Sequence, residues 1–417
     1  MTINAIEAFK KDKPLFLQTA GLYIFAGALP FSVSLIQGGI LLFIAAGLWR
    51  RYSAGTLPAL AKETRATPLF IPWLAYLAAG VLSAAFGIAP AHSFAALNSD
   101  LLTAVSFLGL SLFLEPEPRE KAIRIYLASV TVAAIWGVSQ ALGGIAHGLD
   151  VRAHATSHPV RFGEIMVIGL ALALSRVSSP DNLSPGLKKA LYAVTLLLVS
   201  AIVLSQTRGA YLGMALAFAA MLAVKRPPRR VILPLLAAMA ALGLGLAMLN
   251  PAIRYKLGSI VKGANSAVSA TAQAPDQSIG IRLALWKTGF NMIKERPVLG
   301  FGPASVKKLF PVYCPKPFPD NDVWGSLHNL YIHQAAERGL VGLAALLTLF
   351  GAMLIAALRS YRAAPSSLTL WALLMVLPWF SMNLTEITFQ HVHTSYAVLF
   401  ALAVAITAAK GKASPAL

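Results

Sequence analysis

The chain has 417 residues, of which 57% are hydrophobic and only 12% are charged. A composition this apolar excludes an ordinary soluble globular protein and predicts an all-α polytopic membrane protein. Its 35 Lys and Arg residues outnumber its 16 Asp and Glu residues. In a soluble chain this excess would suggest a nucleic-acid partner, but membrane proteins concentrate basic residues in their cytoplasmic loops, so we expect none. The single cysteine, Cys314, excludes an intramolecular disulfide and a cysteine-based metal site.

Twelve stretches are long and apolar enough to be transmembrane helices. They cover residues 14–31, 33–49, 68–86, 97–114, 125–143, 162–177, 190–206, 209–224, 231–249, 339–358, 367–385 and 394–409. The N-terminal lysines, the apolar run and the AGA triplet that follow one another resemble a signal peptide, but we expect an uncleaved first span.

The basic residues predict the orientation. If the lysine-rich N-terminus is cytoplasmic, alternation places loops 50–67, 115–124, 178–189, 225–230 and 359–366 and the C-terminal tail on the same side. These segments carry the basic motifs RR, PREKAIR, LKK, KRPPRR, RSYR and KGK, whereas the first two outer loops carry none. Both termini are therefore predicted to be cytoplasmic.

One long segment, from Asn250 to about Arg338, has mixed polarity and is predicted to lie outside. Loops of this length inside a compact protein are usually functional. It contains IGIRLALWKTGF, which places Arg282 and Trp286 on one helical face, then the turn-like ERPVLGFGP, then SLHNLYIHQAAERGLVG, a helix that continues into the tenth span. The predicted parts are residues 1–249 with nine membrane helices, a loop domain at 250–338 with the functional motifs, and residues 339–417 with three more helices.

The stretch SQTRGAYLG places Arg208 between two apolar runs, beside Gln206, Thr207 and Gly209. A charged side chain at the membrane centre is unfavourable by about 2.5 kcal/mol or more, and by less toward the interface. At the outer surface, a forked guanidinium suits an anionic ligand, and glycine lets that ligand approach closely. The alternative is an interfacial arginine whose side chain reaches the lipid phosphates.

Four side chains reach the same outer surface in the predicted orientation. They are Arg161 in HPVRFGE at the start of the sixth span, Arg208, Arg282 and His328. Because they are separated by up to about 170 residues in the chain yet converge on one face, we favour a ligand site over independent contacts with lipid.

SQTRGAYLG, RLALWKTGFNMIKERPVLGFGP and HNLYIHQAAERGLVGL, in this order, resemble the signature of the O-antigen ligase and polymerase superfamily. The resemblance is close from Ser205 to about Leu343 and loose for the twelve-span layout. It implies a GT-C-like glycosyltransferase that takes a glycan from an undecaprenyl-diphosphate carrier at the periplasmic face of the bacterial inner membrane. Within the superfamily, the ligase passes O-antigen to a sugar hydroxyl of lipid A-core in lipopolysaccharide biosynthesis. Donor glycan, lipid A-core acceptor and membrane lipids are the implied partners.

By this resemblance Arg208 and Arg282 match the essential arginines of the family, and His328 matches its essential histidine. We expect these three residues to be catalytic. The two arginines are also expected to bind substrate, together with Arg161, Gln206 and Asn329.

Displacing a diphosphate from a sugar builds negative charge on the leaving group, which the site must stabilise. Many glycosyltransferases use a divalent metal ion held by carboxylates. The outer carboxylates here show no metal-ligand spacing; they are Asp150, Glu164, Asp276, Glu295, Asp320, Asp322, Glu337 and Glu386. The motif PDNDVW resembles a fragment of a calcium loop without its glycine and terminal glutamate, which favours a plain turn. Since arginines can stabilise a diphosphate, we expect no metal and no other cofactor.

The acceptor hydroxyl needs a base, and an imidazole that titrates near neutrality suits this role. His328 is the candidate, with Asn329 beside it to orient it or to bind sugar; the alternative is a histidine bonded to backbone at a helix start. His333 is expected to pair with Glu337 one helical turn on. A metal cluster in the third outer loop is a weaker alternative; its histidines are His147, His154 and His158. Direct attack on an α-linked sugar diphosphate would invert the anomeric centre.

Other functions remain open from the sequence. A polymerase would use a second carrier-linked glycan as acceptor, and a protein O-oligosaccharyltransferase would use Ser or Thr of a secreted protein. A transporter would show charges or broken helices at the membrane midplane, where Asp100 is the nearest carboxylate.

The long outer segment also contains a cluster of basic residues: Lys294, Arg296, Lys307, Lys308 and Lys316. This cluster either binds the phosphates of lipid A-core or is a solvated loop. The sequence leaves the oligomeric state open.

Overall fold

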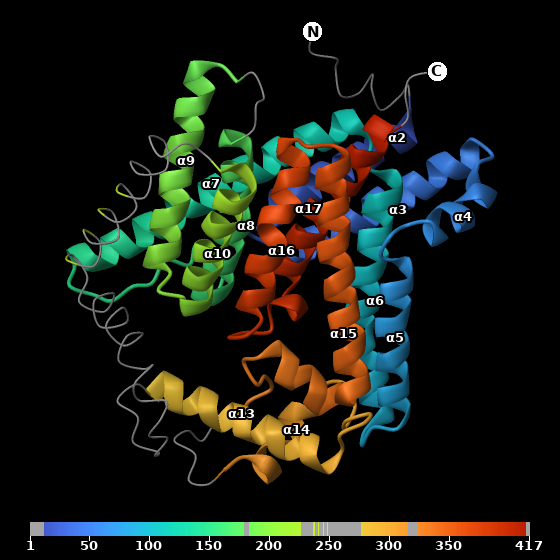
Figure 1. Cartoon of the computed structure of the whole chain (residues 1–417), viewed down its shortest axis with the longest axis vertical. Helices are drawn as coiled ribbons and strands as arrows, with labels where there is room; N and C mark the ends of the chain where they lie inside the picture. Colours follow the sequence, from blue (N-terminus) through green and yellow to red (C-terminus); the bar gives the residue numbers. More distant parts are fainter. Residues whose placement is uncertain are drawn as a thin grey trace.

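The computed structural model describes residues 12–178, 183–226, 277–315 and 323–413, with four isolated residues between 237 and 248. Every element in these ranges is a helix (Figure 1). The first part of the chain forms α2 (Lys13–Ala28), α3 (Val33–Ser53), η1 (Leu57–Ala59), α4 (Leu60–Arg65), α5 (Phe70–Ala85), α6 (Pro90–Phe113), α7 (Pro116–Ala146), α8 (Pro159–Val177), α9 (Pro185–Leu204) and α10 (Arg208–Lys225). The second part forms α13 (Gln277–Glu295), α14 (Val306–Tyr313), α15 (Leu330–Ala363), α16 (Ser367–Met382), η2 (Thr388–Gln390) and α17 (Val392–Ala413).

The all-α prediction is confirmed for the described ranges, and each predicted span there coincides with a helix. The predicted span 231–249 lies outside them apart from isolated residues. Seven described helices are long and apolar enough to cross a membrane: α3, α6, α7, α9, α10, α15 and α17. The segment from η1 through α5, bent by 81°, makes an eighth candidate. These helices are those of a multi-pass membrane protein, but the predicted count of twelve is not confirmed, because α2, α8 and α16 do not meet the same criterion.

The centre of the bundle is formed by α8, α16 and α17. Nearly every residue of α8 from Phe162 to Ser175 is buried, and α16 and α17 are buried on almost all sides. Helices that are apolar all round belong in the interior. Aromatic side chains pack α16 against its neighbours: Trp371 stacks on Tyr126 of α7 with ring centroids 5.6 Å apart and meets Phe400 of α17 edge-on at 5.8 Å.

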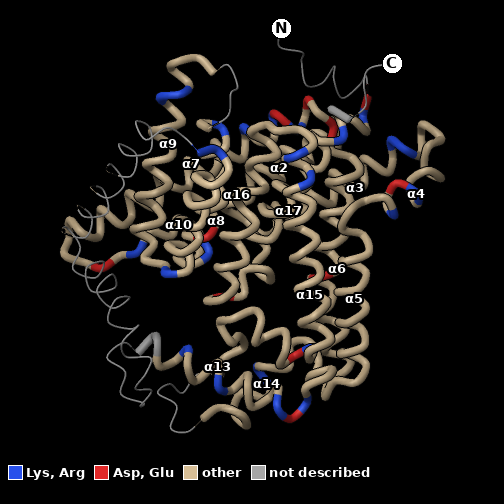
Figure 2. The backbone as a smooth tube through the Cα atoms, viewed as in Figure 1, with Lys and Arg blue, Asp and Glu red and all other residues tan. Residues whose placement is uncertain are grey.

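Charged residues gather at two ends of the helices (Figure 2). One end, where α2 begins, carries ion pairs such as Arg50–Glu115, at 2.6 Å, and Arg176–Glu120, at 2.9 Å. The other end faces α13 and α14. The band between them is mostly uncharged, as expected of a region in contact with hydrocarbon.

The predicted orientation can be tested by labelling. In a Cys314→Ser background, we expect Lys308→Cys, exposed on α14, to react with a membrane-impermeant thiol reagent in intact spheroplasts. Lys188→Cys is the matched control, because this exposed lysine on α9 is predicted to be cytoplasmic and should react only after lysis. Labelling of Lys308→Cys only after lysis would reverse the orientation.

The segment between α10 and the membrane part of α15 has a small apolar core of its own. It is formed by Leu285, Met292, Phe301, Val306, Phe310, Leu327 and Ala336. The predicted continuity of SLHNLYIHQAAERGLVG with the tenth span is confirmed by α15, with a kink at Gly339, where φ is 66°. Just before the kink, Arg338 is buried, pairs with Asp100 of α6 and lies 4.8 Å from the ring centre of Tyr76. Asp100, the carboxylate nearest the predicted membrane midplane, is thus part of a buried ion pair.

The kink requires glycine at residue 339. A Cβ atom there would overlap the carbonyl oxygen of Val298, and a positive φ is itself unfavourable for alanine. We expect Gly339→Ala to lower the free energy of unfolding by at least ~1 kcal/mol. Gly351→Ala is the control on the same helix: nothing lies within 4 Å of its Cβ position, so it should be neutral or stabilising by up to about 1 kcal/mol. Thermal unfolding in detergent measures both, and equal midpoints would contradict the strain at Gly339.

Candidate functional site

Three side chains from distant parts of the chain meet at the end of the bundle that faces α13. Nδ1 of His328 lies 2.7 Å from Oε2 of Glu386, and Nη2 of Arg282 lies 3.5 Å from its Oε1. Glu386 is buried, whereas the side chains of His328 and Arg282 are each about one quarter exposed. The carboxylate of Glu386 therefore contacts both predicted residues, His328 and Arg282, while part of each of their side chains stays exposed.

The backbone around His328 explains how it reaches Glu386. His328 has φ 47°, in the left-handed region that is unusual for a residue with a side chain, and its N–H donates to Oγ of Ser326. The N–H of Leu330 donates to the carbonyl oxygens of Asn383, at 2.9 Å, and Glu386, at 3.1 Å. The start of α15 is thus bonded to the turn that follows α16, which brings His328 and Glu386 together.

Glu386 is an ionised carboxylate. Burial by itself would raise its pKa, but the hydrogen bond with His328 and the electrostatic interactions with His328 and Arg282 lower the pKa of Glu386 below its usual value. An ionised carboxylate can only accept hydrogen bonds, so the nitrogen of His328 that faces it, Nδ1, is the one that donates an N–H.

The turn before α10 is held by the loop between α7 and α8. Gln206 is buried, has φ 52° and donates from Nε2 to Asp150 at 2.6 Å. Arg152 donates from Nε to the carbonyl of Ser205, at 2.8 Å, and from Nη2 to Oγ1 of Thr207, at 3.1 Å. Arg152 lies in no recognisable motif, so its role could not be predicted from the sequence. These bonds fix the backbone on which Arg208 stands.

Arg208 is the first residue of α10 and is partly exposed. The adjacent Gly209 lies so close to Thr385 that a Cβ atom would overlap Oγ1 of Thr385. Thr385 immediately precedes Glu386, so Arg208 starts its helix next to the turn that carries this carboxylate. A side chain at residue 209 would push α10 away from that turn.

Arg161 is exposed in the first turn of α8, and its positive charge acts on His391, Glu164 and His158. Glu164, one turn further along α8, lies with Oε2 3.6 Å from Nδ1 of His391. His391 in turn is near enough to Glu386 for the two groups to interact electrostatically. Arg161 therefore belongs to the same group of charges as His328.

A comparison with known families matches residues 193–347 to the family described as O-antigen ligase. This region belongs to the O-antigen ligase family. The match covers Gln206, Arg208, Arg282 and His328, while Glu386 lies beyond it. No curated protein matches the chain. Members of the O-antigen ligase family are glycosyltransferase-like ligases and polymerases.

Asn329, within the O-antigen ligase region, has a structural role. Its Oδ1 accepts from the N–H groups of Tyr331, at 3.0 Å, and Ile332, at 3.1 Å, so it caps the start of α15. The alternative for His328, a ring bonded to backbone at the helix start, does not describe the structure, since its Nδ1 faces Glu386. Sugar binding by Asn329 remains a prediction.

The expected pairing of His333 with Glu337 is confirmed, with Nε2 3.5 Å from Oε2. His147 and His158 take part in the ends of α7 and α8, through the carbonyl of Gly143 and the N–H of Val160. Within the part of the chain that is described, no three His, Cys, Asp or Glu side chains are grouped to hold a metal ion. The predicted turn with Asp320 and Asp322, and Lys316, lie outside the described residues.

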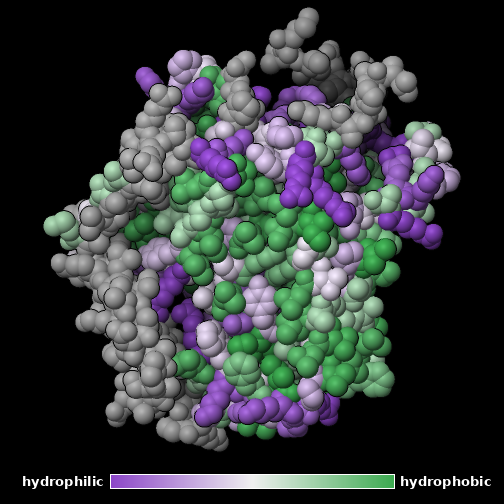
Figure 3. Space-filling view, viewed as in Figure 1, coloured by the Kyte–Doolittle hydropathy of each residue, from purple (hydrophilic) through white to green (hydrophobic). Residues whose placement is uncertain are grey.

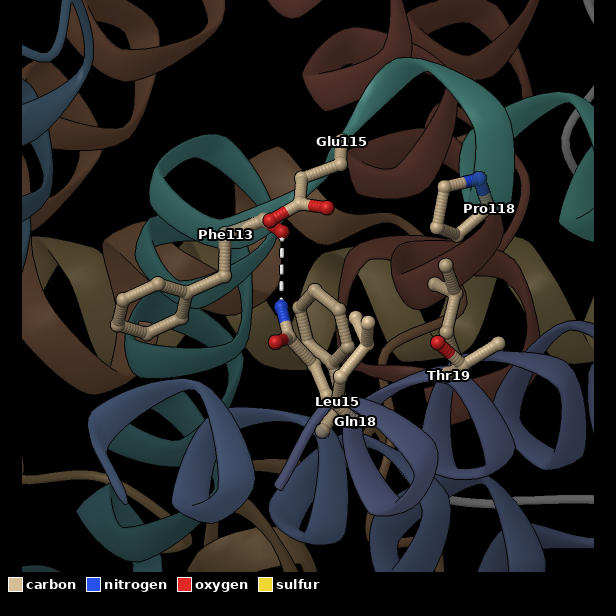
Figure 4. Close-up of a pocket in the computed structure, with 8 residues that line it drawn as sticks. Leu15, Gln18, Thr19, Phe113, Glu115 and Pro118 are labelled. Carbon is tan, nitrogen blue, oxygen red and sulfur yellow. Dashed lines mark hydrogen bonds between the residues drawn. The ribbon is translucent and has the colours of Figure 1, made fainter. Parts of the chain in front are cut away.

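Hydrophilic side chains gather between the lower end of α10 and the layer of α13, beside a mostly apolar surface (Figure 3). Two pockets lie at the end of the bundle where α2 begins. A small one lies where α2 meets the link between α6 and α7, with Gln18 donating to the carbonyl of Phe113 at 3.0 Å (Figure 4). A wider hollow of about 580 Å³ beside it is lined in part by Arg50 and Arg51.

Proposed function

We propose that this protein transfers O-antigen glycan from undecaprenyl diphosphate to a sugar hydroxyl of lipid A-core at the periplasmic face of the bacterial inner membrane. The observation that carries this proposal is the contact of Glu386 with both His328 and Arg282. A base and a phosphate ligand are held there by one carboxylate, and two of the three residues belong to the O-antigen ligase region.

His328 is the general base in this proposal. Its Nδ1–H is donated to the ionised Glu386, so Nε2 is free to take the proton of the acceptor hydroxyl. The imidazolium that forms is stabilised by the carboxylate behind it, and the same hydrogen bond keeps the ring in one orientation.

The arginines act on the diphosphate. As the acceptor oxygen attacks the anomeric carbon, the bond from that carbon to the diphosphate oxygen breaks, and its electron pair leaves with the diphosphate. Arg208, Arg282 and Arg161 stabilise this charge through forked N–H donors that match phosphate oxygens. A single displacement of this kind inverts the anomeric centre. We propose that it needs no metal ion and takes place in a GT-C-like architecture.

Polymerase and protein O-oligosaccharyltransferase activities would share the donor and differ in the acceptor. The test is an assay with purified protein, one carrier-linked glycan and three acceptors, in buffer with and without a chelator. The acceptors are lipid A-core, a second carrier-linked glycan and a pilin-like protein. We expect elongation of lipid A-core alone, unaffected by the chelator. Elongation of another acceptor would replace the proposed function with the corresponding one.

A further inference from the structure

A second histidine–carboxylate pair lies beside the first. His391, immediately before α17, turns its Nδ1 toward Oε2 of Glu164 at 3.6 Å, as His328 turns its Nδ1 toward Glu386. Glu164 is 0% exposed. Among the described residues, neither carboxyl oxygen of Glu164 has a hydrogen-bond partner, and Nδ1 of His391 has none either. A buried carboxyl group without hydrogen bonds is unusual and calls for an explanation.

The two carboxyl groups differ in their surroundings. Glu386 receives an N–H from His328 and has the guanidinium of Arg282 at 3.5 Å. Glu164 receives no donor, and ionising a carboxyl group away from water without hydrogen bonds is strongly unfavourable. Glu164 is therefore a neutral acid whose O–H has one acceptor within reach, Nδ1 of His391. The separation of 3.6 Å is just beyond hydrogen-bond range, so a small movement of either side chain makes the bond.

His391 is a neutral imidazole. Burial is the main cause that lowers the pKa of His391, to about 4, and the positive charge of Arg161 comes next. Glu386 acts in the opposite direction, while His328 and His393 add to the lowering. Nδ1 is buried, but 13% of the side chain is exposed and Nε2 is not among the buried atoms that lack a partner. The ring of His391 lies among the charges around Arg161, because Arg161, Glu386 and His328 all act on it electrostatically.

We propose that Glu164, as a neutral acid, holds His391 in the tautomer that carries its proton on Nε2, and that this N–H donates a hydrogen bond to a diphosphate oxygen of the donor beside Arg161. The assignment rests on the proposed function, because it places a substrate group in the same site. His328 and His391 then have opposite tautomers: His328 accepts a proton through Nε2, and His391 donates a hydrogen bond through Nε2 without transferring its proton. His391 is a substrate-binding residue and Glu164 a positioning residue.

The test measures binding of undecaprenyl diphosphate to the full-length protein in nanodiscs, which needs neither an acceptor nor turnover. Glu164→Gln keeps a neutral N–H donor toward Nδ1, so affinity at pH 7 should stay within about twofold of wild type. Glu164→Leu and His391→Leu remove the donor or the ring and should weaken binding by ~10-fold, the scale of a hydrogen bond to a charged group. His391→Gln, whose amide N–H can replace Nε2–H, should recover most of the loss. Thermal unfolding verifies that each variant is folded.

Equal losses for Glu164→Gln and Glu164→Leu would show that Glu164 acts as an ionised carboxylate and would overturn the proposal. Unchanged binding in His391→Leu would also overturn it. Nitrogen-15 spectra of histidine-labelled protein provide a ligand-free test, with His391→Gln identifying the signal: we expect the proton on Nε2 at neutral pH, and a proton on Nδ1 or on both nitrogens contradicts the assignment. A wild-type protein that shows the expected tautomer but does not bind undecaprenyl diphosphate would contradict the proposed function and the diphosphate contact, but not the role of Glu164.

Discussion

His328→Ala should reduce single-turnover glycan transfer at least ~100-fold, the usual scale of general base catalysis, while donor binding stays near that of the wild type. The reason is that a base acts only as the hydroxyl proton leaves, so its removal affects the transition state and not the bound donor. Rapid-quench transfer at saturating donor measures the first quantity, and equilibrium binding of the carrier-linked glycan measures the second.

Glu386→Gln gives the companion result. Glutamine has the size of glutamate but no charge, so it neither stabilises the imidazolium of His328 nor fixes the tautomer that leaves Nε2 free. Transfer should fall by a factor similar to that in His328→Ala, and the double variant should be little worse than either single one, since both remove one catalytic unit. Losses that multiply in the double variant would show that the two residues act independently.

Arg208→Ala and Arg282→Ala should each weaken donor binding about 10- to 100-fold, the scale of hydrogen bonds to charged groups, and should lower transfer as well. The diphosphate is anionic before and after the bond to the sugar breaks, so a guanidinium paired with it contributes to both states. Lysine at either position keeps the charge and loses the fork, which predicts only partial recovery. Binding and single-turnover transfer in nanodiscs give both quantities for each variant.

Arg65→Ala is the matched control for these substitutions. Arg65 is exposed on α4, at the opposite end of the bundle from His328, so its replacement removes one positive charge from the chain without changing the site. Donor binding should be unchanged. An equal loss in Arg65→Ala would attribute the effect of the arginines to general attraction of an anionic lipid.

The helices were predictable because apolar runs long enough to cross a membrane can be recognised directly in the sequence. The number of membrane spans stays a prediction, since hydropathy does not distinguish a helix buried among other helices from one that faces lipid. α16 illustrates this: its 16 residues are strongly apolar, but the helix lies in the centre of the bundle and is shorter than a typical span. Hydropathy likewise does not report the 81° bend between α4 and α5.

The motif residues Arg208, Arg282 and His328 could be named from sequence, and the cap formed by Asn329 follows from an asparagine at a helix start. Their partners could not. Glu386 follows His328 by 58 residues across two intervening helices, and only the folded chain brings the two together. Arg152 lies in the connection between α7 and α8, His391 lies just before α17, and neither belongs to a motif. Their proximity to the site depends on how the helices are packed against one another.

The most direct test of the account compares His328→Ala and Arg208→Ala side by side, with donor binding and single-turnover transfer measured on the same nanodisc preparations. The predicted result is that His328→Ala binds donor nearly as the wild type does and transfers it at least ~100-fold more slowly, whereas Arg208→Ala is impaired in both. Loss of donor binding in His328→Ala together with intact binding in Arg208→Ala would contradict these roles and make His328 a phosphate ligand.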